Sequence, residues 1–271
     1  MCSLLGVSTS GYYAHFSRPP SQRRLENLAL LEIIRNIHEE SDATYGHKRV
    51  HAELRHQGIH VSPNRVRRLM RVDGLTGIVK KRRSRAPQVA AEGVHAADLV
   101  MRVWHPDSVG AINVLWVADI TYIRTWQGWL YLAVVMDTYS RRIVGWSMQP
   151  HMRSELVQDA LDMAVDRRRP KPGLVHHSDH GTQYTALTFG HELKKHGIDS
   201  SMGRVRTCFD NAVAESFFAT LKKERINRYS WPTRHDAQLT LFDYIERWYN
   251  VKRRHSTLGY LTPAEYEDTG T

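Results

Sequence analysis

The first quarter of the chain has the apolar spacing of helices. Leucine and isoleucine recur every three or four positions, as on the buried face of an α-helix, at Leu25, Leu28, Leu31, Ile34 and Ile37. Two shorter apolar stripes follow in HKRVHAELRHQG and VSPNRVRRLMRVDG, and in the second Ser62 can cap the helix, Pro63 suits its first turn and Gly74 favours its end. We therefore predict a small all-α, helix-turn-helix-like region over residues 1–79.

After residue 110 the apolar pattern becomes that of strands. NVLWVADITYIRT, WLYLAVVMDTYS and RRIVGWSMQ are runs of apolar, β-branched and aromatic residues with short connections, which predicts an antiparallel meander with a turn at Gln127 and Gly128. GLVHHSDHG and DSSMG predict two more short strands, and helical patterns lie between and after them. The order indicates an α/β domain over residues 111–271, with a mixed five-stranded sheet and flanking helices. We expect the tryptophans of the meander in its core: Trp116, Trp126, Trp129 and Trp146.

The charge of the chain points to a polyanionic partner. Its 271 residues carry a formal net charge of +10, which favours nucleic acid. Residues 1–105 hold 17 Lys and Arg against 9 Asp and Glu, whereas residues 106–271 hold 21 against 19. No apolar run reaches the roughly 18 residues of a membrane span, and the N-terminus lacks the layout of a signal peptide. We expect a cytoplasmic protein that has no membrane partner.

The basic residues of the front half concentrate on one short helix and one linker. The helix carries Arg65, Arg67, Arg68 and Arg71. Four arginines on so short a helix exceed what solubility requires, so we expect them to contact DNA; the alternative is the solvated basic face of a small helical bundle. KKRRSR opens a stretch without periodicity and predicts a basic linker over residues 80–110.

Three acidic residues stand where acids are unusual. Asp119 interrupts the apolar strand LWVADITYI, Asp179 follows the fourth strand, and Glu215 borders the buried stripe of a helix, with Lys222 two turns further along the same face. Each has an ordinary alternative, namely an edge position facing water, a helix cap and a solvated boundary residue. Together they form an all-oxygen ligand set that suits Mg²⁺ or Mn²⁺. Two such ions can clamp the two oxygens of a phosphoryl displacement, and Lys222 can contact a phosphate.

The histidines around Asp179 do not have the pattern expected of a zinc site. Zinc requires about four nitrogen or sulfur ligands, whereas His176 and His177 are adjacent on a strand and point to opposite faces. No second ligand pair such as HxxxH or CxxC is present nearby. We interpret these histidines as hydrogen-bonding groups around the carboxylates or as phosphate and water contacts.

Several segments together resemble a known family. WVADITYI, HHSDHGTQY, DNAVAESFFATLKKE and YNVKRRHSTLGYLTPAEY resemble the integrase core of bacterial insertion-sequence transposases, most closely the second reading-frame product of the IS-three family. Asp179 and Glu215 have 35 residues between them, which is the family's DD(35)E interval, and Lys222 also matches. ATYGHKRVHAEL resembles the family's helix-turn-helix-like segment. The resemblance covers essentially the whole chain.

The resemblance implies both a fold and a reaction. It implies a ribonuclease H-like fold with Asp119 on the first strand, Asp179 after the fourth and Glu215 on the following helix. It implies DNA transposition: metal-dependent cleavage at the element ends exposes a 3′-hydroxyl, which then attacks a second phosphodiester. The implied partners are double-stranded DNA at the terminal inverted repeats and at the target, further copies of the chain on DNA, and the upstream reading-frame product as a fusion or a partner. We expect the protein at the bacterial nucleoid.

The family motifs also suggest supporting residues. These residues, which we expect to shape the site or to contact DNA, are His177, Gln183, Tyr184 and Asn211. The basic loop YNVKRRHS contains Arg254 and His255, which either grip DNA phosphates or pack the last helix onto the sheet; both interpretations stay open. Two other functions compete with transposition, a ribonuclease H-like nuclease that only hydrolyses and a non-catalytic DNA-binding repressor.

Overall fold

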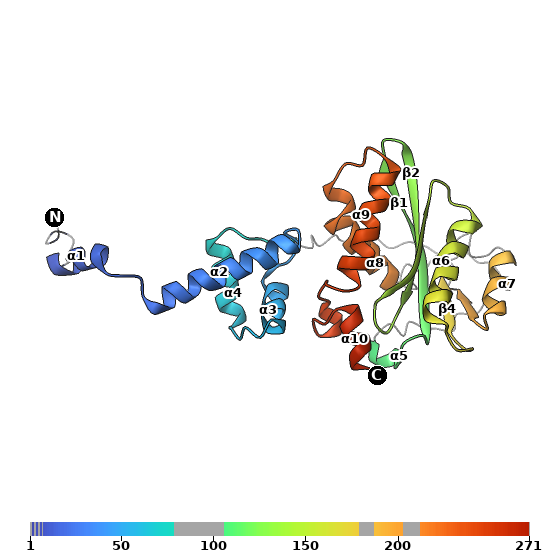
Figure 1. The fold of residues 1–271 in the computed structure, drawn as a ribbon, viewed down its shortest axis with the longest axis horizontal. Helices are drawn as coiled ribbons and strands as arrows, with labels where there is room; N and C mark the ends of the chain where they lie inside the picture. The colour runs from blue at the N-terminus through green and yellow to red at the C-terminus, as the bar shows by residue number, and fades with distance from the viewer. Residues whose placement is uncertain are drawn as a thin grey trace, which may run out of the picture. The chain divides into compact units, whose positions relative to one another are not determined.

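The computed structural model describes residues 8–78, 106–178, 187–202 and 212–270, together with Cys2, Leu4 and Gly6. The chain divides into an N-terminal unit, Met1–Val79, and a C-terminal unit, Lys80–Thr271 (Figure 1). The predicted basic linker falls largely outside the described residues and stays a prediction. Among the described helices, none is both long enough and apolar enough to cross a bilayer.

The N-terminal unit is helical. Its helices are α1 Thr9–Ser17, α2 Gln22–Glu40, α3 His47–His56 and α4 Pro63–Val72. As predicted, Ser62 caps α4: its Oγ accepts a hydrogen bond from the backbone N–H of Arg65 at 3.2 Å. Helix α1, which the apolar pattern did not predict, is capped in the same way by Ser8.

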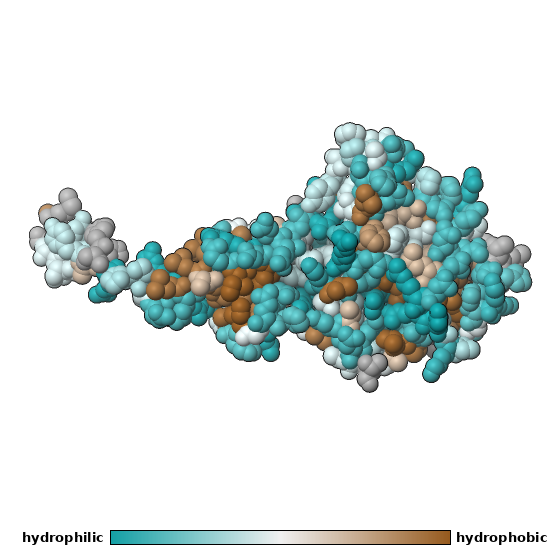
Figure 2. Space-filling view, in the orientation of Figure 1, coloured by the Kyte–Doolittle hydropathy of each residue, from teal (hydrophilic) through white to brown (hydrophobic). Residues whose placement is uncertain are grey.

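Only part of the predicted apolar face of α2 is buried. The buried residues of α2 begin at Leu30, whereas Leu25 and Leu28 are about half exposed. Figure 2 shows apolar residues gathered over α2 and α4 on this face of the unit. The second half of α2 is held to α4 because Arg35 binds Asp73 through two hydrogen bonds, of 2.8 and 2.6 Å.

The C-terminal unit contains the predicted five-stranded mixed sheet. Its strands are β1 Leu115–Thr125, β2 Gly128–Asp137, β3 Ile143–Gln149, β4 Val175–Ser178 and β5 Asp199–Met202. The order is β3-β2-β1-β4-β5. The first three strands form an antiparallel meander, and β4 and β5 run parallel to β1. This arrangement confirms the ribonuclease H-like fold that the resemblance implied.

Helices cover both faces of the sheet (Figure 1). The helical segments of this unit are α5 Pro106–Val109, α6 Ser154–Arg168, α7 Leu187–Lys195, α8 Ala212–Glu224, η1 Ile226–Arg228, α9 Arg234–Asp243, η2 Tyr244–Tyr249, η3 Ser256–Leu258 and α10 Pro263–Thr269. Side chains alternate along β1, so Val117 and Ile123 pack in one core with α8 and α9, whereas Trp116 and Ala118 pack in the other with α6 and α7.

Two details of this unit were not predicted from the sequence. Trp116 is buried and Trp146 is partly buried, but Trp126 and Trp129 are 77% and 44% exposed at the end of the β1–β2 hairpin. The last long helix is α9 continued by the π-helix η2, in which Tyr244 and Tyr249 are both buried although they are five residues apart.

Candidate active site

Asp119 lies on β1 where the described pairing with β4 ends. The last paired residues are Ala118 and Ser178, so β1 continues beyond them with only β2 as a described neighbour. Asp119 is partly exposed, and its Oδ1 accepts a hydrogen bond from the N–H of Ile120 at 2.7 Å. By the alternation of the strand its side chain shares the face of Val117, which is the face that α8 covers.

Glu215 lies in the first turn of α8 and is exposed. The predicted buried stripe of this helix is confirmed at Ala214, Phe217, Phe218 and Leu221. The stripe packs α8 against the sheet, in the core that also contains residues of β1 and β2. The carboxylate of Glu215 is therefore left at the margin of a fixed helix, accessible to a ligand.

Helix α8 and the segment after it advance in the same direction as β1. The Nζ atom of Lys222 lies 5.6 Å from the ring centroid of Tyr122. Further along both segments, the N–H of Trp126 donates a hydrogen bond to the carbonyl of Trp231 at 3.0 Å. From the first contact to the second, both segments therefore run toward the end of the β1–β2 hairpin.

This direction sets Glu215 and Asp119 at the opposite end of the contact. Glu215 precedes Lys222 by seven residues, which is about 10.5 Å along the same face of a helix. Asp119 precedes Tyr122 by three residues, about 10 Å along a strand. Glu215 and Asp119 thus precede the Lys222–Tyr122 contact by similar distances along their own segments.

Four of the predicted site residues lie outside the described residues: Asp179, Gln183, Tyr184 and Asn211. The register up to that point is nevertheless informative. Each paired residue of β4 follows its partner on β1 by 60 positions, from Leu115 and Val175 to Ala118 and Ser178. Asp119 and Asp179 have this same separation in the sequence.

The adjacent histidines face opposite sides of the sheet, as predicted. The Nδ1 atom of His177 lies 2.9 Å from Ser201 Oγ on β5. The ring of His176 packs edge-on against Phe189 of α7, with centroids 5.4 Å apart. Burial lowers the pKa of His176 to about 4, so its ring is neutral at neutral pH. The two rings cannot bind one ion together.

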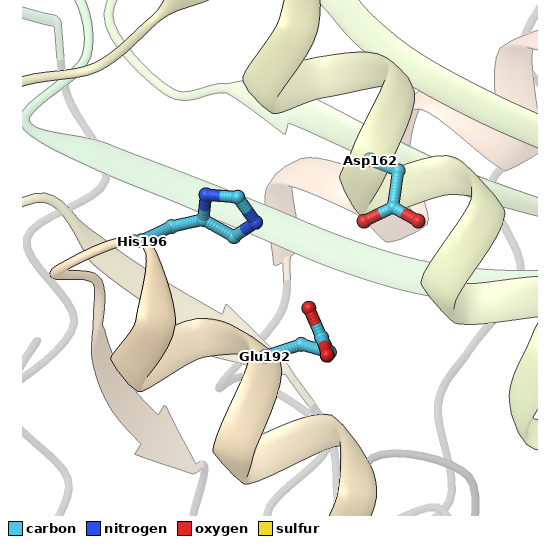
Figure 3. Close-up of side chains that lie close together, drawn as sticks. All are labelled: Asp162, Glu192 and His196. Carbon is cyan, nitrogen blue, oxygen red and sulfur yellow. The ribbon is translucent and has the colours of Figure 1, made fainter.

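A different group of possible ligands lies on α6 and α7 (Figure 3). Asp162, Glu192 and His196 point toward one another, with ligand atoms all within 4.8 Å. Burial, and then the charge of Glu192, raise the pKa of Asp162, while Glu192 also pairs with Lys195 at 3.3 Å. The sequence signal for this group was the i, i+4 spacing of Glu192 and His196. Because α6 and α7 cover the face opposite to that of Asp119, this group is separate from the predicted carboxylates.

The arginines of α4 do not form a uniform set. Arg67, Arg68 and Arg71 are exposed. Arg65 instead binds α2: its Nε donates to Asn27 Oδ1 at 2.9 Å, and its guanidinium lies 3.4 Å from a carboxylate oxygen of Glu26. DNA contact therefore stays a prediction for the exposed three, while Arg65 has an intramolecular role.

The predicted DNA contacts at Arg254 and His255 require correction. Arg254 is 4% exposed and forms an ion pair with Glu265 of α10, and His255 is 7% exposed and packs edge-on against Tyr249, with centroids 4.8 Å apart. Asn250 exchanges two hydrogen bonds with the backbone of Ile143, of 2.9 and 3.0 Å. The terminal motif thus fastens the end of the chain to β3, which is the packing alternative.

A buried ion pair that the sequence did not predict holds α8 in place. Arg253 donates two hydrogen bonds to Glu224 of α8, of 2.8 and 2.7 Å, and Tyr244 donates a third to the same carboxylate at 2.8 Å. Burial and the neighbouring carboxylate raise the pKa of the Tyr244 hydroxyl. Glu224 and Arg253 are 29 residues apart, so no local spacing could have revealed the pair.

Comparison with known proteins identifies the family. Residues 111–208 and 196–263 match models of the integrase core domain, and residues 25–83 match an HTH-like domain. An insertion element IS600 protein of Shigella sonnei is 39% identical over 99% of this chain and 97% of its own length. The transposase of insertion sequence IS904 from Lactococcus lactis is 38% identical (92% and 98%), and transposase InsF of IS3A from Escherichia coli is 36% identical (99% and 93%). This chain therefore belongs to the insertion-sequence transposases of the IS-three family, in which an HTH-like region precedes an integrase core.

Proposed function

We propose that this transposase cleaves DNA at the ends of its element and joins the freed 3′-hydroxyl to a second DNA through Asp119, Asp179 and Glu215. The observation that carries the proposal is the common direction of α8 and β1, along which Glu215 and Asp119 precede the Lys222–Tyr122 contact by similar distances. The constant offset between β1 and β4, equal to the separation of Asp119 and Asp179, supports the same assignment.

The donor set fits divalent cations. The proposed ligands are carboxylate oxygens, which Mg²⁺ and Mn²⁺ prefer. The nearby histidine on β4, His177, is hydrogen-bonded to Ser201 instead of serving as a proposed ligand. When bound, two such ions supply activation of the attacking oxygen and stabilisation of the departing one. Asp119 and Glu215 would hold them from a strand and a helix that are fixed by packing. Lys222, about 10.5 Å from Glu215 along α8, would bind a neighbouring phosphate of the same DNA strand.

The remaining partners follow from the reaction and the charge. The exposed arginines of α4 would bind the phosphates of the terminal inverted repeats, and the C-terminal unit would receive the cleaved end and the target DNA. We expect at least two copies of the chain on DNA, because the reaction brings the two ends of one element together. We also propose that the upstream reading-frame product acts as a fusion or a partner, and that the protein works in the bacterial cytoplasm at the nucleoid.

The test is a strand-transfer assay with purified full chain, Mg²⁺, a labelled duplex carrying the inverted repeat that flanks the gene, and a target plasmid. We expect joined products for the wild type and a loss of at least about 100-fold for Asp179→Asn and Glu215→Gln. The matched control is Asp162→Asn, which removes a carboxylate from the separate group on α6 and α7 and should retain activity.

The other outcomes distinguish the competing functions. Cleavage without joining would favour a nuclease, and binding without any product would favour a repressor or a missing upstream partner. Loss of activity in Asp162→Asn, together with full activity in Glu215→Gln, would move the metal site to α6 and α7 and refute the assignment of the carboxylates.

A further inference from the structure

The end of the β1–β2 hairpin exposes three aromatic rings. Trp126, Tyr122 and Trp129 are 77%, 58% and 44% exposed. Tyr122 and Trp129 stack edge-to-face, with centroids 5.2 Å apart and planes at 86°. Aromatic side chains are normally the largest contributors to a core, so three exposed rings on one hairpin indicate a binding surface.

The hairpin end is fixed, so the rings are presented in a defined place. The N–H of Trp126 donates to the carbonyl of Trp231 at 3.0 Å, and Thr125 Oγ1 donates to the carbonyl of Gly128 at 2.6 Å. Arg234, the first residue of α9, donates through Nε to the carbonyl of Trp129 at 3.0 Å. A surface that is already ordered loses little conformational entropy when it binds a ligand.

The charges around the rings favour an anionic ligand with flat apolar faces. Lys222 lies over the Tyr122 ring, Arg124 is exposed on β1, and Arg234 binds the carbonyl of Trp129 at the hairpin end. The nearby acid, Asp236, accepts hydrogen bonds from Thr233 in the cap of α9. Exposed rings interleaved with cations are the pattern that binds unpaired nucleotides, whose bases stack while their phosphates contact Lys and Arg.

The distance to the carboxylates places such a base along the strand. Tyr122 is three residues, about 10 Å, from Asp119 along β1, and the two side chains leave the strand on opposite faces. Lys222 of α8, whose Nζ atom lies 5.6 Å from the centroid of the Tyr122 ring, links the hairpin to the helix that carries Glu215. DNA advances 3.4 Å per nucleotide when its bases are stacked, so this distance corresponds to about three nucleotides. A DNA end held at Asp119 and Glu215 that passes the edge of β1 beside Lys222 would reach the hairpin over this distance.

We propose that Tyr122, Trp126 and Trp129 form a stacking platform for an unpaired base about three nucleotides from the reacting phosphate. The platform would hold the DNA end open, with Lys222 on the adjoining backbone. This inference rests on the proposed function, because that function puts the DNA end at Asp119 and Glu215. It extends that function by assigning the hairpin a role in positioning the melted end.

The experiment measures binding of the full chain, without divalent metal, to two labelled DNAs by fluorescence anisotropy. One duplex has its last four base pairs mismatched, with 2-aminopurine in the open strand, and the other is fully paired. We expect Trp126→Ala and Trp129→Ala to weaken binding of the open end about 5- to 100-fold, to change binding of the paired end less than about 2-fold, and to abolish quenching of 2-aminopurine. Trp126→Phe should retain both the affinity for the open end and the quenching of 2-aminopurine. Phe242→Ala, which removes a 42% exposed ring from α9, is the control.

The outcomes separate this inference from the function on which it rests. Equal loss for both DNAs, or unchanged quenching in the double variant Trp126→Ala, Trp129→Ala, would overturn the platform. In either case, joined products from the wild type in Mg²⁺ would leave the proposed function standing. Selective loss on the open end by a chain that makes no joined product would support the platform as a DNA site, and would point to failure of the proposed chemistry alone.

Discussion

Replacing Arg253 with alanine tests how the terminal motif holds the active-site helix. The side chains of Arg253 and Glu224 are 5% and 6% exposed, and the variant leaves the Glu224 carboxylate buried without its guanidinium partner, while the hydroxyl of Tyr244 still donates to it. Removing one partner of a buried ion pair costs about 3–5 kcal/mol, because the other charge stays desolvated. We therefore expect the C-terminal unit to lose most of its stability.

The size of this loss is bounded by protonation of the carboxylate. A glutamate with the ordinary pKa of about 4.3 takes up a proton at pH 7 at a cost of about 4 kcal/mol, and at pH 5 of about 1 kcal/mol. The variant can always escape by this route, so its defect should shrink as the pH falls from 7 to 5. A lost packing contact would show no such dependence.

The assay is unfolding of the full chain in urea, followed by tryptophan fluorescence at pH 7 and pH 5. All seven tryptophans lie in the C-terminal unit, so the signal reports that unit alone. The control is Arg247→Ala, which breaks a surface pair with Asp243 of 3.2 Å whose side chains are 76% and 55% exposed. That change should cost no more than about 0.5 kcal/mol. Equal losses in the two variants, or a loss for Arg253→Ala that is the same at both pH values, would refute the reasoning.

Three further predictions concern packing, pH and DNA. Gly145→Ala should destabilise the C-terminal unit by at least about 1–3 kcal/mol, because its Cβ would clash with the backbone of α6, whereas Gly190→Ala has open space and should not; equal urea midpoints would contradict this. The pKa of His176 falls from 6.5 to about 4 on folding, so the contribution of this residue to the free energy of unfolding is complete above pH 6.5 and is lost as the pH drops toward 4, by up to about 3 kcal/mol. If a His176→Phe variant kept the full acid sensitivity of the wild type, this cause would be excluded. The double variant Arg67→Ala, Arg68→Ala should lower the slope of log affinity against log salt for duplex DNA by about 2, and an unchanged slope would remove these residues from the interface.

The sequence determined the secondary structure because its signals are local. The cap at Ser62, the turn at Gly128 and the stripe of α8 each depend on a few neighbouring residues, and all were correctly predicted. The element order then left few ways to pair the strands, so the mixed sheet followed. The candidate carboxylates could also be selected, because Asp119 conflicts with an apolar strand and because Asp179 and Glu215 match a family interval.

Whether a residue at the edge of a predicted element is buried depends on which other elements pack against it. Only the tertiary structure decides that. Trp126 and Trp129 are of a residue type that is usually found in cores, but they lie at a hairpin end that remains exposed. Leu25 and Leu28 continue the apolar face of α2 but are about half exposed. Arg254 is of a residue type that commonly contacts DNA, but its side chain is buried and forms an ion pair with Glu265 of α10.

The sequence by itself therefore determined most of the elements and the sheet, which periodicity and turns encode over short distances, and it selected the candidate acids. Only the tertiary structure decided that Glu224 pairs with Arg253, that Lys222 lies over Tyr122, and that α8 advances with β1. These contacts join residues far apart in the chain. Their energies come from desolvation and packing, which exist only once the helices and the sheet have come together.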